Sequence, residues 1–175
     1  ALPGGRRRTR LLVCISSAHA QDLSDLTKIR EATSARVSSA SPDAWSNRDN
    51  RWVKPGETFT MADLAGPGVI RHIWLTFSEA RPNWLSKDGA AAPDEVVLRM
   101  YWDGASEPAV EAPLGDFFAA GFGRRAPVVS TPVIVQGGDS YNCFWPMPFE
   151  RSARITVTNE SDKPLAALYY QVDYT

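Results

Sequence analysis

Hydrophobic and polar side chains alternate along several short segments of the chain. In residues 96–102, Val96, Leu98, Met100 and Trp102 share one face of an extended backbone. This period of two is typical of a strand with one buried face. Similar segments occur at residues 52–60, 69–77, 128–135, 141–149, 153–158 and 168–174. Glycines and prolines separate the segments, which favours many short strands joined by turns.

The segment 96–118 carries the clearest local signals. Asp103-Gly104 is the residue pair preferred by a two-residue hairpin turn of positive φ, so a second strand is expected directly after it. Pro113 ends that strand, and Gly115 frees the backbone for a corner, Gly-Asp-Phe-Phe at residues 115–118. An acid and two phenylalanines at a corner either close the end of a sheet or line a cleft.

One segment, residues 21–37, has a helical pattern. Leu23, Leu26, Ile29 and Val37 fall near one face, and Asp22 is a suitable cap. The remainder shows neither a β-α-β rhythm nor a repeat. The predicted fold is an all-β, antiparallel two-sheet jelly-roll sandwich of about eight strands over residues 38–175, preceded by one short N-terminal helix.

Residues 1–20 have the features of a secretory signal peptide. An arginine block at residues 6–10 precedes a short apolar run, and Ala18-His19-Ala20 has the form of a cleavage site. We therefore expect a secreted or periplasmic protein. Loss of four arginines lowers Lys+Arg from 19 to 15 against 20 Asp+Glu, a formal charge of −5. An acidic surface disfavours nucleic acid and anionic membranes as partners.

Few catalytic groups remain after this cleavage. Cys143 is then the only cysteine and His72 the only histidine, which excludes an internal disulfide and a cysteine-based zinc site. His72 shares a strand face with Trp74, a pattern that fits either a second buried layer or a ligand surface. No nucleotide-binding, zinc-protease or nucleophile-elbow motif occurs, so we expect no metal and no cofactor. Carboxylates are the only plentiful catalytic groups, and paired acids would suit glycoside hydrolysis.

Four blocks of the sequence resemble one known family. They are GPGVIRHIWLTF at residues 66–77, LRMYWDGASEPAVEAPLGDFF at 98–118, YNCFWPMPFERSARITVTNE at 141–160 and LYYQVDY at 168–174. The resemblance is to the DUF2961 proteins, now grouped as glycoside hydrolase family 172, and runs from about residue 38 to the C-terminus. It implies a retaining hydrolase of α-D-fructofuranosides or D-arabinofuranosides. The implied substrate is a furanose-containing oligo- or polysaccharide.

The family resemblance also implies two tandem jelly rolls and trimer-based homo-oligomers, of which this chain covers the first jelly roll. The catalytic glutamates of the family belong to GEGD and GTEDYF motifs, and neither motif occurs here. No catalytic residue is therefore assigned to this chain, which we expect to be inactive alone. The expected partners are the sugar, the second jelly-roll domain and further copies of the chain.

The candidate substrate-binding residues lie in family-like blocks. The polar loop before residue 51 contributes Asn47, Asp49 and Asn50, the corner contributes Asp116, Phe117 and Phe118, and Trp145 follows the aromatic strand. Asp116 either binds furanose hydroxyls or holds the corner by accepting backbone N–H groups. The loop residues either face sugar or form a solvated turn. The alternative for the whole chain is a non-catalytic carbohydrate-binding or structural assembly module.

Overall fold

The computed structural model describes residues 27–29, 31–43, 45–77, 89–137 and 139–175. Ala32–Thr175 forms one compact unit, and the preceding unit, Ala1–Glu31, is described only at residues 27–29 and 31. The expected signal peptide and the start of the expected helix therefore lie outside the described residues. All that follows concerns the unit that begins at Ala32.

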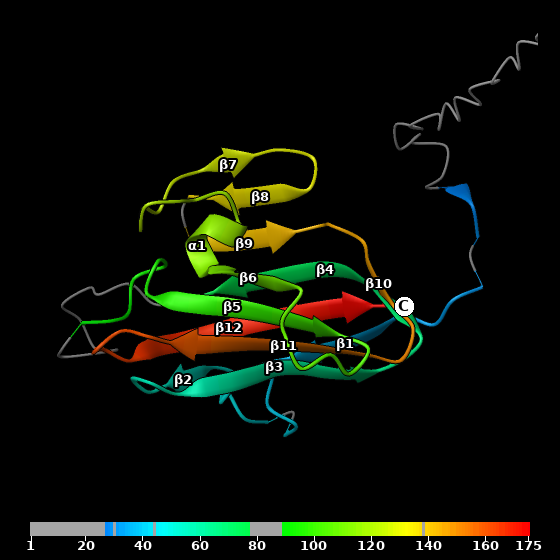
Figure 1. Cartoon of the computed structure of the whole chain (residues 1–175), viewed down its shortest axis with the longest axis horizontal. Coiled ribbons are helices and arrows are strands. Elements are labelled where there is room, and N and C mark those ends of the chain that lie inside the picture. Colours follow the sequence, from blue (N-terminus) through cyan, green and yellow to red (C-terminus); the bar gives the residue numbers. More distant parts are fainter. Residues whose placement is uncertain (1–26, 30, 44, 78–88, 138) are drawn as a thin grey trace, which may run out of the picture. The chain divides into compact units, whose positions relative to one another are not determined.

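Two antiparallel sheets form this unit (Figure 1). The larger sheet has eight strands: β1 (Ala35–Ser38), β2 (Arg51–Val53), β4 (Gly68–Thr76), β7 (Val128–Val129), β8 (Val133–Gln136), β9 (Ser140–Cys143), β10 (Met147–Phe149) and β12 (Leu165–Tyr174). The smaller sheet has four strands: β3 (Thr58–Ala65), β5 (Val96–Trp102), β6 (Val110–Pro113) and β11 (Ser152–Asn159).

The strand order confirms the predicted jelly roll. In the larger sheet β12 and β4 are central, with β2 and β1 beside β12 and β9 beside β4, while the smaller sheet runs β3-β11-β5-β6. Consecutive strands β3 and β4 lie in different sheets, as do β11 and β12, so the chain crosses repeatedly between the layers. This interleaving is the arrangement of a jelly roll.

The core lies between the two sheets. Leu98, Met100 and Ile155 of the smaller sheet are fully buried, as are Leu75 and Val172 of the larger sheet. The alternation seen in the sequence of β5 is therefore the alternation between core and exterior. Twelve strands occur in the described residues rather than about eight, because the expected segments 52–60, 128–135 and 141–149 are each split in two and β1 is an additional strand.

The predicted helix over residues 21–37 is wrong at its C-terminal end. Residues 35–38 form β1, in which Val37 lies opposite Val172 of β12. A free edge of β12 satisfies the backbone N–H and C=O groups of residues 35–38, so tertiary pairing overrides the local helical pattern there.

The predicted Asp103-Gly104 turn is present, with φ values of 58° and 79°. Ala105 donates its N–H to the carbonyl of Trp102 at 3.0 Å, which closes the turn. The next strand does not follow directly, however, because β6 starts only at Val110. The turn thus forms as expected, but it opens a longer connection than a two-residue hairpin.

Candidate functional site

The Gly-Asp-Phe-Phe corner is a short helical turn, α1 (Leu114–Phe117), directly after β6. Gly115 donates its N–H to the carbonyl of Pro93 and accepts the N–H of Ala120 at 2.9 Å. A Cβ atom on Gly115 would stand 2.8 Å from the Ala120 oxygen and 3.0 Å from Pro93 Cβ. Only glycine fits this close approach, so the corner is held rigidly against the 89–95 segment.

The carboxylate of Asp116 does not hold the corner. The backbone carbonyls of Gly115 and Asp116 receive the N–H groups of Phe118, Ala119 and Ala120. The Asp116 side chain is exposed and makes no hydrogen bond with the described residues. Of its two expected roles, accepting backbone N–H groups is therefore wrong, and the carboxylate is free to meet a ligand or another surface.

The two phenylalanines of the corner have different environments. Phe118 is fully buried, and its ring meets that of Tyr141 edge-on at 5.5 Å. A ring inside the core cannot touch a ligand, so the substrate-binding assignment of Phe118 is wrong. The Phe117 ring packs edge-on against Phe118 at 5.0 Å and is only half-buried. The corner therefore both closes the sandwich and presents one aromatic ring outward.

Phe117 lines an open cavity of about 360 Å³, which we call the aromatic pocket. Trp102 and Val110 line it from β5 and β6, residues 145–146 from the segment between β9 and β10, and residues 147–148 from β10 itself. Trp145 is 53% exposed there. The pocket thus lies where strands of both sheets meet, and it brings together two of the residues expected from sequence, Phe117 and Trp145.

The aromatic pocket is almost wholly apolar. Indole and phenyl faces bury large areas of apolar surface, and ligand sites of this size are lined mainly by such side chains with a few polar groups for orientation. None of the lining residues carries a charge. The described pocket can hold the C–H face of a ring, and it has no acid or base of its own.

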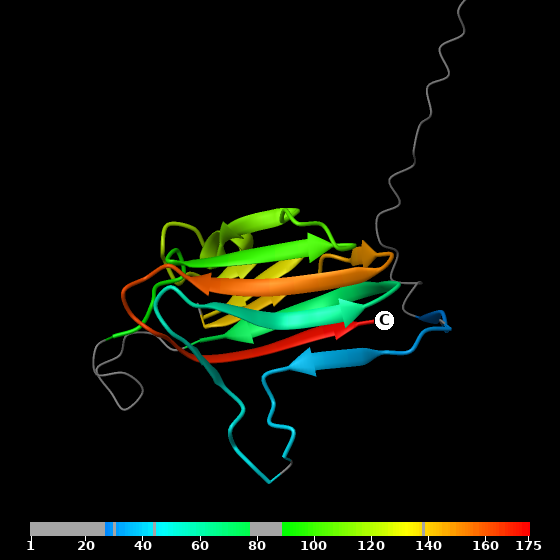
Figure 2. The ribbon, with the colours of Figure 1, turned by 60° about the horizontal axis from the view of Figure 1, so that its bottom comes forward.

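The polar loop lies apart from this pocket. Figures 1 and 2 place the described loop residues, 40–43 and 45–50, on the opposite side of the sandwich from α1, projecting away from the sheets. Asn50 donates a hydrogen bond to the Tyr169 hydroxyl at 3.4 Å, Asp49 is half-buried and Asn47 is exposed. None of the three lines the aromatic pocket. The candidate residues therefore form two groups rather than one cluster.

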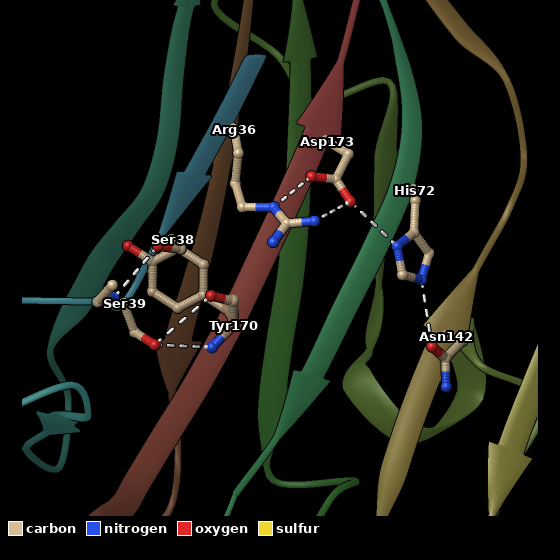
Figure 3. Close-up of polar contacts among 8 residues, drawn as sticks. Arg36, Ser38, Ser39, His72, Asn142, Tyr170 and Asp173 are labelled. Atoms are coloured by element: carbon tan, nitrogen blue, oxygen red, sulfur yellow. Dashed lines mark hydrogen bonds and ion pairs between the residues drawn. The ribbon is translucent and has the colours of Figure 1, made fainter. Parts of the chain in front are cut away.

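A polar network crosses the outer face of the larger sheet (Figure 3). Arg36 of β1 pairs with Asp173 of β12 through two nitrogens, and the same carboxylate lies 3.3 Å from His72 Nδ1 on β4. His72 Nε2 lies 3.1 Å from Oδ1 of Asn142 on β9. The hydrogen bond from Arg36, followed by that from His72, lowers the pKa of Asp173.

Sequence reasoning found part of this network and missed the rest. The face shared by His72 and Trp74 was recognised as a second buried layer or a ligand surface, and it proves to be a half-buried outer face. Trp74 donates its indole N–H to Ser140 at 2.9 Å. Arg36 and Asp173 were missed because residue 36 was expected to be helical. Only the strand register, which places residues 36, 173 and 72 in one row across the sheet, reveals that these side chains meet.

The part of the chain that the structure describes offers few other catalytic or metal-binding groups. Cys143 is buried, and burial raises the pKa of its thiol, which disfavours a nucleophilic thiolate. Among these residues no group of three or more His, Cys, Asp and Glu side chains is suited to a metal ion. The described helices include none with the length and apolar character needed to cross a membrane.

Comparison with protein families identifies a match over most of this unit. The model of the GH172 domain-like family matches residues 44–172, which include the aromatic pocket, the corner and the outer-face network except Arg36 and Asp173. A search of curated proteins found no match. The match confirms the family that the four sequence blocks resemble. The chain belongs to the GH172 domain-like family and is thereby related to glycoside hydrolases.

Proposed function

We propose that this chain forms one wall of the substrate pocket of a secreted glycoside hydrolase that acts on furanosides by a retaining mechanism. The observation that carries the proposal is the aromatic pocket, in which Trp102, Phe117 and Trp145 converge from both sheets. Flat apolar faces of this kind suit the C–H surface of a sugar ring. Asp116, next to Phe117 on a rigid corner, adds a hydrogen-bond acceptor for hydroxyl groups.

The positions of the carboxylates in the described chain support the proposal that this chain supplies only part of the active site. A retaining mechanism needs two carboxyl groups about 5–5.5 Å apart on either side of the scissile bond. The lining of the aromatic pocket contains none. Glu111 is paired with Arg99, and Glu107 is exposed in the loop before β6. In our proposal the nucleophile and the acid come from the second jelly roll that the family resemblance implies.

The pocket is open on its outer side, and we propose that this second domain, within a trimer-based assembly, closes it. Trp145, which lines the pocket, is 53% exposed, and Phe144, which precedes it in the chain, is 43% exposed. Neighbouring apolar side chains at a surface are typical of an interface or a ligand groove. We propose that Asn47, Asp49 and Asn50, on the polar loop far from the pocket, form a second contact, either with the sugar or with the second domain.

Binding of furanosides by the 175-residue chain tests this proposal. Titration calorimetry with difructose dianhydride and with D-arabinofuranosyl oligosaccharides should give weak binding, and cellobiose should give none. Trp145→Ala should abolish the binding because it removes an exposed pocket wall. Phe122→Ala is the matched control, since Phe122 is 95% exposed and does not line the pocket. Equal binding by both variants would contradict the assignment.

A non-catalytic carbohydrate-binding module is the second candidate, and the absence of carboxylates from the lining of the aromatic pocket favours it. The two functions can be distinguished by the gene sequence downstream of this chain and by whether sugar is released. A reading frame that continues into GEGD and GTEDYF motifs, and a product that releases free furanose, would support the hydrolase. Tight glycan binding without release of sugar by the complete gene product would support the module.

A further inference from the structure

Arg71 interrupts the regular pairing between β4 and β12. Two consecutive residues of β12, 173–174, lie opposite positions 72 and 70 of β4, so residue 71 has no residue opposite it. An extra residue in one strand of an antiparallel pair is a β-bulge, which changes the direction of a side chain and is common beside functional sites. Ile70 and Ile73 are buried in the core, so the two residues between them lie on the outer side of the sheet. The bulge therefore adds an arginine to the polar network of the outer face.

Arg71 lines an open cleft of about 500 Å³, which we call the arginine cleft. Its other walls are residues 34–36, which lead into β1, and residues 173–175, where β12 ends. Arg36 and Asp173, which pair with each other across the outer face, are among these residues (Figure 3). None of the residues that line this cleft lines the aromatic pocket. The cleft is therefore a second candidate site with its own chemistry.

The guanidinium group of Arg71 is only partly engaged. Its Nε donates a hydrogen bond to the hydroxyl of Thr175 at 3.2 Å. Its two terminal nitrogens form no hydrogen bond and no ion pair with any of the described residues, and the side chain is exposed. Two parallel N–H groups at the end of a guanidinium match the two oxygens of a carboxylate. This edge of Arg71 is thus open to a bidentate ligand.

The side-chain charges around the cleft favour a ligand with a single negative charge. Asp173 pairs with Arg36 and lies 3.3 Å from His72 Nδ1, so Arg36 already has its counter-ion. Arg71 has no acidic partner among the described residues, which leaves one positive charge unbalanced. A carboxylate balances this charge. A phosphate dianion would carry excess negative charge beside the Asp173 carboxylate and would be repelled by it.

Two hydroxyl groups on the lining can orient such a ligand. The Thr175 hydroxyl accepts the hydrogen bond from Arg71, so its own proton remains available for a ligand oxygen. Ser34 is exposed on the lining and adds a second hydroxyl. Hydroxyl groups both donate and accept, whereas a guanidinium only donates. The lining therefore suits a molecule that carries a carboxylate and hydroxyl groups together.

We propose that the arginine cleft binds the carboxylate of a small organic acid. The two terminal nitrogens of Arg71 donate to its two oxygens, and the hydroxyls of Thr175 and Ser34 contact the polar groups beside it. The ligand is a free carboxylate or the uronic acid unit of a glycan, since both present the same group. The site is independent of the proposed furanoside binding, because the two linings share no residue.

An NMR titration of the isotope-labelled 175-residue chain with D-glucuronate tests the site. The Nε–H resonance of Arg71 is the one absent from Arg71→Gln. It should shift and saturate as glucuronate is added, and D-glucose at the same concentrations should leave it unchanged. Followed at the backbone N–H of Thr175, Arg71→Gln should weaken binding by about tenfold or more, the loss expected for hydrogen bonds to a charged group. Absence of any shift at Arg71 would overturn the proposal.

Arg154→Gln is the matched control. Arg154 is exposed on the outer face of the smaller sheet, where its guanidinium lies 4.2 Å from the centroid of the Tyr101 ring, and it does not line the cleft. This variant should bind glucuronate as wild type does, and an equal loss in both variants would contradict a specific site. If Arg71→Gln fails to fold, Thr175→Val replaces it and should weaken binding severalfold, because it removes one hydroxyl. Unchanged binding in that variant would then overturn the proposal.

Further ligands distinguish the sources of the carboxylate. Acetate binding as tight as glucuronate binding would support a site for free carboxylates, and tighter glucuronate binding would support the uronic acid unit. Inorganic phosphate that binds more tightly than both would overturn the choice of a carboxylate. Because the α-carboxylate of Thr175 can compete in the 175-residue chain, the titration is repeated with a Gly-Gly extension after this residue. The extended chain should bind at least as tightly, and weaker binding would contradict the proposal.

Discussion

The carboxylate of Asp103 accepts the backbone N–H of Arg151 at 2.7 Å and so joins two turns that are far apart in sequence. The same oxygen accepts the N–H groups of Glu150 at 2.9 Å and Ser152 at 3.3 Å. In return, the Arg151 guanidinium donates to the carbonyl of Asp103. The turn after β5 is thereby fixed to the turn between β10 and β11, at one end of the smaller sheet.

Replacement of Asp103 should lower stability in a pH-dependent way. Backbone hydrogen bonds, first that of Arg151, lower the pKa of Asp103 in the folded state. A carboxyl group with a lowered pKa contributes stability above its unfolded value, near 3.8, and this contribution is lost as pH falls through the folded value. Urea unfolding should therefore show Asp103→Asn less stable than wild type at pH 7, with the difference shrinking toward pH 2. A difference independent of pH would contradict this account.

Substitution of Asn159 should lower the stability of the fold, because its side chain is buried and its amide group is fully hydrogen-bonded. Its amide nitrogen donates to the carbonyls of Val53 and Lys163, and its oxygen accepts the N–H of Ser161 at 3.0 Å. Asn159→Ala leaves these three groups without their partner, at a cost of about 1–3 kcal/mol for an unsatisfied buried polar group. Chemical denaturation measures the loss. Asp162→Ala is the control, since Asp162 lies in the adjacent turn and is exposed.

The corner should accept no side chain at Gly115. A methyl group there would stand 2.8 Å from the Ala120 oxygen, so Gly115→Ala should cost about 1–3 kcal/mol, as overpacking does elsewhere. Gly121→Ala is the matched control, because its methyl would meet only the Asp116 carboxylate, at 3.2 Å. Thermal unfolding of the two variants compares them directly. A larger loss for Gly121→Ala would show that the corner is not held as described.

Substitutions of the adjacent residues Phe117 and Phe118 should affect stability and binding differently. Phe118→Ala removes a fully buried ring and should lower the free energy of unfolding by about 3–5 kcal/mol. Phe117→Ala removes a half-buried pocket wall, so it should cost less stability and weaken furanoside binding. Denaturation and calorimetry on both variants check this. Retained binding in Phe117→Ala would remove that residue from the site.

A small part of the candidate site could be predicted from local sequence. Phe117 and Trp145 were identified from aromatic blocks, and both line the pocket. Trp102 and Met147, which also line it, are predicted from sequence only as strand residues, because their meeting depends on how the two sheets stack. Phe118 was placed in the site and lies in the core. Two neighbouring phenylalanines are indistinguishable by composition, and only the turn of α1 decides which ring faces inward.

The sequence by itself determined the class of fold, since alternation with a period of two and the turn residues act locally. It also determined the Asp103-Gly104 turn and, through four aromatic blocks, the family. Tertiary structure decided the rest. Pairing with β12 made a strand of residues 35–38, and register placed Arg36, Asp173 and His72 in one row. Such contacts join residues 101 to 137 positions apart, and no local pattern specifies which distant edge a segment will meet.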